Sequence, residues 1–171
     1  MGWVETGFAA SGDMYLLPKL GFMEIDLQNA RNSASFGLLY GYGLSQNVSI
    51  EAEVNVTLNV LSSSASGGEY DQIVDGNLTH EGQYKVSTGA AYFVYRLPVV
   101  GTSYVKGKLG ALYEQIERTD NIGDPDKKND TGAAGGLGFG ALLFDTVTLE
   151  LEATLIDKNI TFYSLGAHIL F

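Results

Sequence analysis

The segment Asn47–Val60, NVSIEAEVNVTLNV, alternates without exception between polar and apolar residues. A period of two places successive side chains on opposite faces of a β-strand, whereas a helical face repeats every three to four residues. The segment Thr146–Leu155, TVTLELEATL, has the same design. The two segments therefore predict strands with one apolar and one polar face, in a sheet that separates two different environments.

Weaker alternation predicts six further strands, and no segment predicts a helix. These strands are expected at Gly2–Ser11, Ser33–Leu44, Gln83–Tyr95, Ser103–Gln115, Thr131–Leu143 and Thr161–Phe171. Three of the links between strands, Gly12–Asn32, Leu61–Glu81 and Arg118–Asp130, are long, and the others are short. All three prolines, Pro18, Pro98 and Pro125, fall in the expected connections, as β-ladders require. The sequence predicts one all-β domain over residues 1–171, an eight-stranded antiparallel up-and-down barrel.

Composition excludes several classes of protein. The formal net charge is -10, so a basic footprint for nucleic acid is missing. The chain has no cysteine, which excludes disulfides and thiolate metal sites. No apolar run approaches the roughly 18–20 residues of a membrane-spanning helix. The start, MGWVETGF, lacks the basic and apolar regions of a signal peptide, so we expect a mature chain whose leader has been removed.

The alternation fits both a soluble lipocalin-like barrel, apolar inside, and a membrane barrel, apolar outside. The polar faces carry mostly Gly, Ser, Thr, Asn and Glu with few lysines, unlike a water-facing surface with long charges of both signs. Tyrosines recur on the apolar faces toward strand ends, as in the aromatic girdle of a membrane barrel, at Tyr40, Tyr42, Tyr84 and Tyr163. With short links at one end and long links at the other, these features favour lipid outside and a transmembrane β-barrel.

Across all eight expected strands the chain resembles the small OmpA/OmpX-type outer-membrane β-barrels of Gram-negative bacteria. The resemblance is most specific in the final residues, SLGAHILF. In that family the last strand carries an assembly signal: a polar residue, a glycine two positions on, then two hydrophobic or aromatic residues spaced by one. Ser164, Gly166, Ile169 and Phe171 match this pattern.

The resemblance implies a monomer in the bacterial outer membrane that is recognised by the barrel-assembly machinery. It also implies contact with membrane lipid and lipopolysaccharide, and external loops that meet host or other surface ligands. Salt-bridge clusters in the lumen are a further property of such small barrels.

Charged residues on the polar faces would lie inside the barrel, where they must pair. The sequence therefore predicts a lumen ion-pair network of Glu5, Glu51, Glu53, Lys85, Lys106, Lys108, Glu114, Glu150 and Glu152. Paired carboxylates such as Glu51 and Glu53 can also serve acid–base catalysis, but beside lysines their better use is to neutralise those lysines. No cofactor motif occurs, so we expect neither a cofactor nor enzymatic activity.

One of the expected links is rich in acidic residues. The stretch Asp120–Asp130, DNIGDPDKKND, concentrates carboxylates that could bind a divalent cation, but its spacing misses the EF-hand register and two lysines intervene. A solvated loop is the favoured interpretation.

Two hypotheses for the function remain. The first hypothesis is a structural protein that makes surface contacts through its external loops. The alternative is a narrow pore with a mild cation preference, because glutamates outnumber lysines in the expected lumen.

Overall fold

The computed structural model describes residues 11–25, 32–58, 68–69, 72–74, 77–79, 83–119, 126–143, 147–157 and 160–170. Its strands are β1 (Met14–Ile25), β2 (Ser33–Gly43), β3 (Val48–Leu58), β4 (Gly68–Glu69), β5 (Gln72–Val74), β6 (Asn77–Thr79), β7 (Gln83–Pro98), β8 (Ser103–Thr119), β9 (Asp126–Leu143), β10 (Val147–Asp157), β11 (Ile160–Ala167) and β12 (Ile169–Leu170). Within these ranges no helix is long and apolar enough to cross a bilayer.

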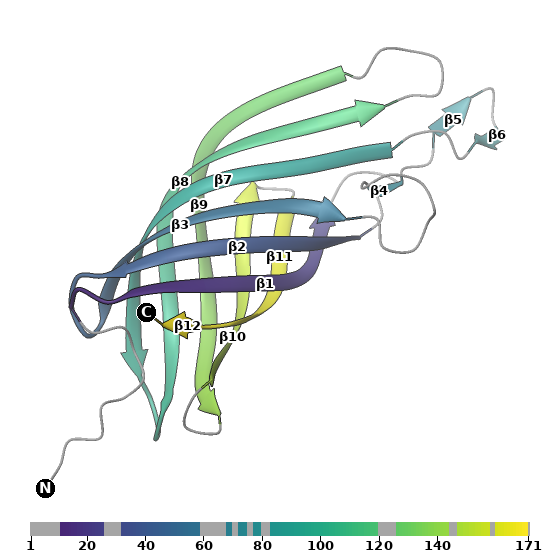
Figure 1. The fold of residues 1–171 in the computed structure, drawn as a ribbon. Coiled ribbons are helices and arrows are strands. Elements are labelled where there is room, and N and C mark those ends of the chain that lie inside the picture. Colours follow the sequence, from purple (N-terminus) through teal and green to yellow (C-terminus); the bar gives the residue numbers. More distant parts are fainter. Residues whose placement is uncertain are drawn as a thin grey trace, which may run out of the picture.

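The long strands close into an antiparallel barrel of eight strands (Figure 1). Around the barrel the order is β1, β2, β3, β7, β8, β9, β10 and β11, and β11 pairs again with β1. After His168, β12 continues along β1 as the end of the last strand. The predicted fold class is therefore confirmed.

The first barrel strand is not the one that the sequence predicts. We expected a strand at Gly2–Ser11 and a link at Gly12–Asn32, but Met14–Ile25 forms β1, and residues 1–10 lie outside the described part of the chain. On β1 the inward face carries Leu17 and Met23 as well as Tyr15, all three fully buried, while the outward face is also apolar. Because the inward face is mostly apolar and Lys19 is its one charged residue, the sequence of the strand shows no clear alternation.

Pro18 lies inside β1 and not in a connection, contrary to our expectation, and Pro98 is the last residue of β7. Proline has no N–H to donate to a ladder. The ladder between β1 and the last strand is interrupted at Leu17 and Pro18, and it resumes in the same register on either side. On the other side of the last strand, the His168 N–H donates to the Thr148 carbonyl of β10, at 2.9 Å, so the ladder with β10 continues past the gap. The barrel therefore tolerates a proline at its closing seam.

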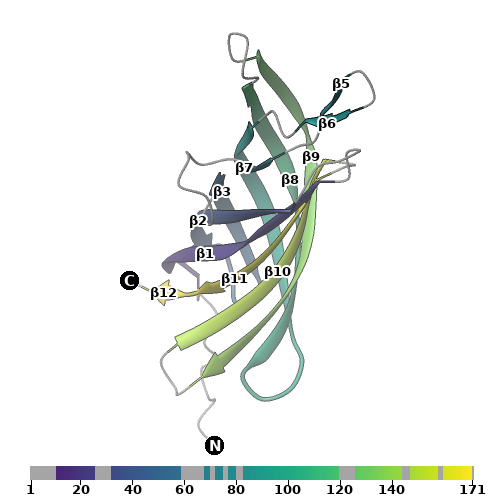
Figure 2. The ribbon, with the colours of Figure 1, turned by 90° about the vertical axis from the view of Figure 1, so that its right-hand side faces the viewer.

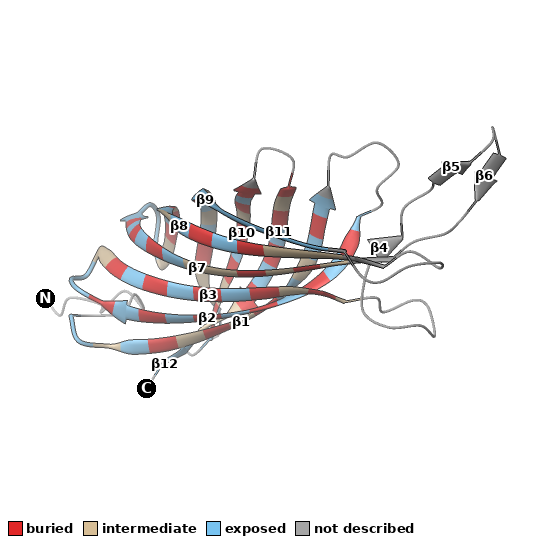
Figure 3. Ribbon diagram, turned by 90° about the horizontal axis from the view of Figure 1, so that it is seen from above, coloured by how far each residue is buried: buried red, intermediate tan, exposed pale blue. Residues whose placement is uncertain are grey.

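Burial alternates along the strands, as Figure 3 shows, and it separates two faces. The exposed positions form an apolar outer belt, which includes Phe22, Phe36, Leu38, Tyr40, Tyr42, Val54, Phe93, Leu109, Leu137, Phe139, Leu151, Tyr163 and Leu165. Of the predicted girdle, Tyr40, Tyr42 and Tyr163 lie on this belt, and the Tyr84 side chain lies outside the described part. On β2, β3, β8, β9, β10 and β11 the expected apolar faces point outward and the expected polar faces point into the lumen. On β7 the expected faces are reversed, because Val86, Tyr92 and Val94 are buried inside the barrel.

Three strands extend past their neighbours at the end of the barrel that carries the long connections (Figure 2). The ladders of β7, β8 and β9 continue to Gln83↔Thr119 and Arg118↔Asp126. The flanking ladders end earlier, at Val56↔Ser87 and Gly135↔Leu155. We call residues 83–87, 115–119 and 126–133 the flange.

Two of the links expected from the sequence contain strands. β9 begins at Asp126, inside the expected Arg118–Asp130 link, and the expected Leu61–Glu81 link contains β4, β5 and β6.

A charge on the outer belt tests the assignment of this face to lipid. Leu151 points outward from β10 and is 58% exposed. We expect Leu151→Arg to lower the free energy of unfolding in lipid vesicles by about 2–4 kcal/mol, because the charge must enter hydrocarbon. The control is Asn129→Arg on the exposed flange, which should change stability by no more than about 0.5 kcal/mol. Urea titration measures both; equal losses would contradict a lipid-facing Leu151.

Candidate functional site

Eight buried charged side chains meet inside the barrel. This lumen charge network comprises the cations Lys19, Arg96, Lys106 and Lys108 and the carboxylates Glu51, Glu53, Glu150 and Glu152, none more than 5% exposed. They project from β1, β3, β7, β8 and β10. Six of them form pairs that lie two residues apart on one strand. Because side chains alternate between the two faces of a strand, both members of each pair point inward. Opposite charges balance four to four within the network, which burial in a narrow lumen requires.

Lys106 is the centre of the network. Its Nζ lies 2.8 Å from a carboxylate oxygen of Glu51, 2.8 Å from one of Glu150 and 2.7 Å from one of Glu152. Its side chain is 0% exposed. A single ammonium thus joins β8 to β3 and β10 across the lumen.

Two further lysines complete this layer. Lys108 Nζ lies 2.6 Å from Glu53 and 2.7 Å from Glu152. Lys19 Nζ lies 3.0 Å from Glu53 and 2.5 Å from Glu152. Glu152 therefore contacts three lysines, and Asn55 and Thr154 donate further hydrogen bonds to Glu53 and Glu152.

A tyrosine, a glycine and a glutamate in register across three strands form a repeated unit of the lumen wall. Tyr15 on β1 pairs with Gly41 on β2, which pairs with Glu51 on β3. The Tyr15 ring covers Gly41, where a Cβ atom would overlap it, and its hydroxyl donates to Glu51 at 2.6 Å. The glycine is needed because the ring lies directly against the backbone of the next strand.

The same unit occurs a second time on β8, β9 and β10. Tyr104 pairs with Gly140, which pairs with Glu150. The ring again occupies the space of a glycine Cβ, and the hydroxyl donates to Glu150 at 2.5 Å. The barrel thus places two equivalent tyrosine–carboxylate pairs in its wall.

Arg96 lies between the two tyrosine rings. Its guanidinium carbon is 5.1 Å from the Tyr15 ring centroid and 5.6 Å from that of Tyr104, within the range of cation–π attraction. It also donates to Glu51 at 2.5 Å and to Ser49 at 2.7 Å. Nearby, His168 Nε2 is 3.2 Å from Glu150 and 3.0 Å from the Tyr104 hydroxyl. These groups close the lumen at the end of the short turns.

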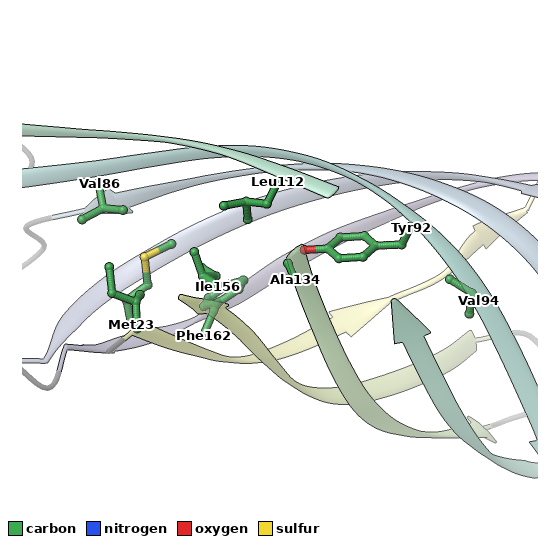
Figure 4. Close-up of a cluster of buried hydrophobic side chains, with 9 residues drawn as sticks. Met23, Val86, Tyr92, Val94, Leu112, Ala134, Ile156 and Phe162 are labelled. Atoms are coloured by element: carbon green, nitrogen blue, oxygen red, sulfur yellow. The ribbon is translucent and has the colours of Figure 1, made fainter. Parts of the chain in front are cut away.

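A cluster of apolar side chains is also buried in the lumen, most of it toward the loops. We call this cluster the lumen plug: Met23, Val86, Tyr92, Val94, Leu112, Ala134, Ile156, Ile160 and Phe162, each no more than 5% exposed (Figure 4). Polar side chains such as Thr57, Thr154 and Glu114 are buried beside it, so the expectation of a polar lumen holds only in part. The plug meets the charge network at Tyr92, whose ring lies under the Lys108 ammonium at 4.1 Å from its centroid.

The structure brings together six of the nine residues predicted for the lumen network: Glu51, Glu53, Lys106, Lys108, Glu150 and Glu152. Glu114 is also buried on the inward face of β8, farther toward the loops. Lys85 was placed wrongly: it alternates with the buried Val86, pairs in register with Glu117 and faces outward. Glu5 lies outside the described residues.

Sequence reasoning missed Lys19 and Arg96. Lys19 was missed because β1 was taken for a link. Arg96 was missed because the expected strand ended at Tyr95, although Arg96 continues the inward positions of Tyr92 and Val94. Extending the strand by one residue would not have been enough, because a strand with Lys85 in the lumen has Arg96 on the opposite, outer face.

The remaining predicted positions divide between the two faces. Ser164 and Gly166 face the lumen and are buried, Ile169 is 54% exposed, and Phe171 lies outside the described residues. Of the Asp120–Asp130 stretch, residues 120–125 also lie outside them, and Asp130 accepts a hydrogen bond from the Thr131 N–H. In the part of the chain that the structure describes, no three acidic or histidine side chains are grouped to hold a metal ion.

The family model and the solved structures that match this chain describe outer membrane proteins. A family model described as outer membrane protein beta-barrel domain matches residues 5–170. OprG of Pseudomonas aeruginosa is similar in structure, with a TM-score of 0.61 and 14% identity over 96% of this chain and 98% of that one. A major outer membrane protein of Thermus thermophilus has a TM-score of 0.63 and 11% identity over 94% of this chain and 100% of that one.

The attachment invasion locus protein Ail of Yersinia pestis, in complex with the heparin analogue sucrose octasulfate, is a third similar structure. Its TM-score is 0.57, with 16% identity over 96% of this chain and all of that one. At these identities the likeness is one of fold. No curated protein sequence matches the chain.

Removing the central cation tests how much the network contributes. We expect Lys106→Met to destabilise the barrel by about 3–5 kcal/mol, because three carboxylates lose a buried partner. The control is Lys127→Met, which removes an ion pair of equal length, 2.8 Å to Glu117, from an exposed site. That variant should lose less than about 1 kcal/mol. Urea unfolding in vesicles gives both values, and a loss for Lys106→Met as small as that of the control would indicate a hydrated lumen.

Proposed function

The chain belongs to the outer membrane protein beta-barrel domain family and is a protein of the bacterial outer membrane, and from this premise we propose that it is a sealed barrel that makes contacts at the cell surface. The observation that carries the proposal is the filled lumen, which holds both the lumen charge network and the lumen plug. A barrel that conducts nothing acts through the surfaces that it presents.

Both lumen layers oppose conduction. An ion that crosses the charge network has to separate pairs such as Lys106–Glu51 and Lys106–Glu150, whose side chains are fully buried. Breaking a buried pair costs about 3–5 kcal/mol. The ion would then meet the lumen plug, which offers apolar side chains and little compensation for lost hydration.

The flange supports a role in surface contacts. It holds the outer ends of β7, β8 and β9 in continuous ladders beyond the other strands. Its outward face is polar, with the Glu117–Lys127 ion pair exposed on it. A rigid polar platform of this kind positions the connections that it carries, which is how loops on a scaffold usually bind ligands.

One similar structure and the charge of the chain bear on the class of ligand. The similar structure of Ail contains a heparin analogue, which is a precedent for a surface ligand on this fold. The present chain has a formal charge of -10, so for a soluble ligand of the loops long-range electrostatics favours a neutral or cationic molecule over a polyanion. We assign the chain no catalytic role and propose that it acts as a monomer in contact with membrane lipid and lipopolysaccharide.

Planar-bilayer recording separates this proposal from the narrow-pore alternative. We expect folded protein in the bilayer to give no discrete current steps at either polarity, because both lumen layers are closed. Heat-modifiable mobility of the same sample on a gel confirms that the barrel is folded. Stable openings with a cation preference would overturn the sealed barrel and support the pore.

We also propose that Ser164, Gly166, Ile169 and Phe171 form the signal read by the barrel-assembly machinery. Ile169 points outward on the closing strand, where another protein can reach it. Phe171→Ala should refold in detergent as wild type does, yet give less folded barrel in outer-membrane fractions of cells. Leu170→Ala, which alters a neighbouring apolar residue outside the signal, is the control. Equal cellular levels of Phe171→Ala and wild type would contradict the proposal.

A further inference from the structure

The turn between β7 and β8 is short, ordered and apolar. The Val99 N–H donates to the Ser103 carbonyl at 3.0 Å, and the Ser103 N–H donates to the Val100 carbonyl at 3.1 Å. Gly101 adopts a φ of 61°, in the left-handed region that a glycine enters without strain. The turn is therefore a fixed structure that presents Val99 and Val100 at its tip.

These two valines are widely exposed. Val99 is 55% exposed and Val100 is 78% exposed, and Leu97 beside them on β7 is 54% exposed. Val100 has the largest exposed fraction among the large hydrophobic side chains that the structure describes. A turn of this kind in water would normally carry polar residues.

The apolar turn continues the outer belt without interruption. On the outward face of β7, Phe93, Tyr95 and Leu97 lead from the belt to the turn, and Val105 and Leu109 continue it on β8. The charged residues at this end of the hairpin all point into the lumen and are buried. They are Arg96, Lys106 and Lys108. No charge therefore separates the turn from the surface that faces lipid.

The turn between β2 and β3, at the same end of the barrel, is built differently. Ser45 and Gln46 are exposed. The Ser45 hydroxyl oxygen accepts hydrogen bonds from the Asn47 and Val48 N–H groups. This polar turn suits water, so the two turns indicate different depths for the two sides of the barrel.

We propose that the β7–β8 turn is inserted into the periplasm-facing leaflet of the membrane, with Val99 and Val100 in contact with acyl chains, while the β2–β3 turn lies in water. The occupant of the apolar tip is lipid, because the tip is continuous with a surface that lipid already covers. The barrel is then held at an angle, with the β7–β8 side deeper in that leaflet.

Spin labels measure the depth of the turn directly. The chain has no cysteine, so Val100→Cys gives one labelling site. Gln46→Cys provides the standard for water, and Leu109→Cys, 69% exposed on the outer belt, provides the standard for lipid. The barrels are refolded into vesicles of phosphatidylethanolamine and phosphatidylglycerol, with a nickel chelate on both sides of the membrane. Power saturation then gives the ratio of oxygen to nickel accessibility at each position.

We expect the ratio at position 100 to be severalfold higher than at position 46 and closer to that at position 109. A ratio closer to that at position 46 would overturn the proposal, because the vesicles contain no other protein to cover the turn. A second measurement avoids the label. Val99→Ser combined with Val100→Ser should lower the urea midpoint in vesicles, while Gln46→Ser should leave it unchanged; equal midpoints for the two variants would also contradict insertion.

Discussion

Closure of the backbone ladder is the constraint on which the rest of this structure depends. Inside a bilayer each unpaired N–H or C=O group costs several kcal/mol, so a sheet can span it only when its first strand meets its last. Here β1 pairs with β11 and β12, and the seam keeps one register across the interruption at Pro18. Once the barrel closes, one face of every strand contacts lipid and the other contacts a lumen just wide enough for side chains.

The small lumen explains the arrangement of its charges. The lumen charge network buries four cations and four carboxylates, and each would be strongly destabilising alone. Shared contacts, such as the three carboxylates around Lys106, compensate for the loss of water. The tyrosine–glycine–glutamate units fit two large rings into the same layer because the facing glycines have no Cβ. Toward the loops, the apolar side chains of the lumen plug fill space without any need for partners, and polar side chains such as Thr57 and Glu114 are buried beside them.

The two ends of the β7–β8 hairpin have opposite characters. Toward the loops the hairpin becomes the polar flange, with Lys85 and Glu117 on its outward face. Toward the short turns it ends in exposed valines that continue the apolar surface. In the membrane position that we propose, the hairpin spans from the cell surface to the periplasm-facing leaflet. If the lumen is sealed as proposed, the outer end has the greater functional interest, because contacts there need no passage through the barrel.

By itself the sequence determined the fold class, the number of barrel strands and the orientation of most faces. Segments such as Asn47–Val60 alternate clearly, because the outer face contacts lipid and is apolar, whereas the lumen face contacts charged partners and is polar. Only the tertiary structure decided where the first strand lies, that Lys85 faces outward, and that Lys19 and Arg96 join the network. The physical reason is the lumen plug: where Met23 or Val86 replaces a polar group inside the barrel, both environments are apolar, and the period of two no longer identifies the strand or its faces.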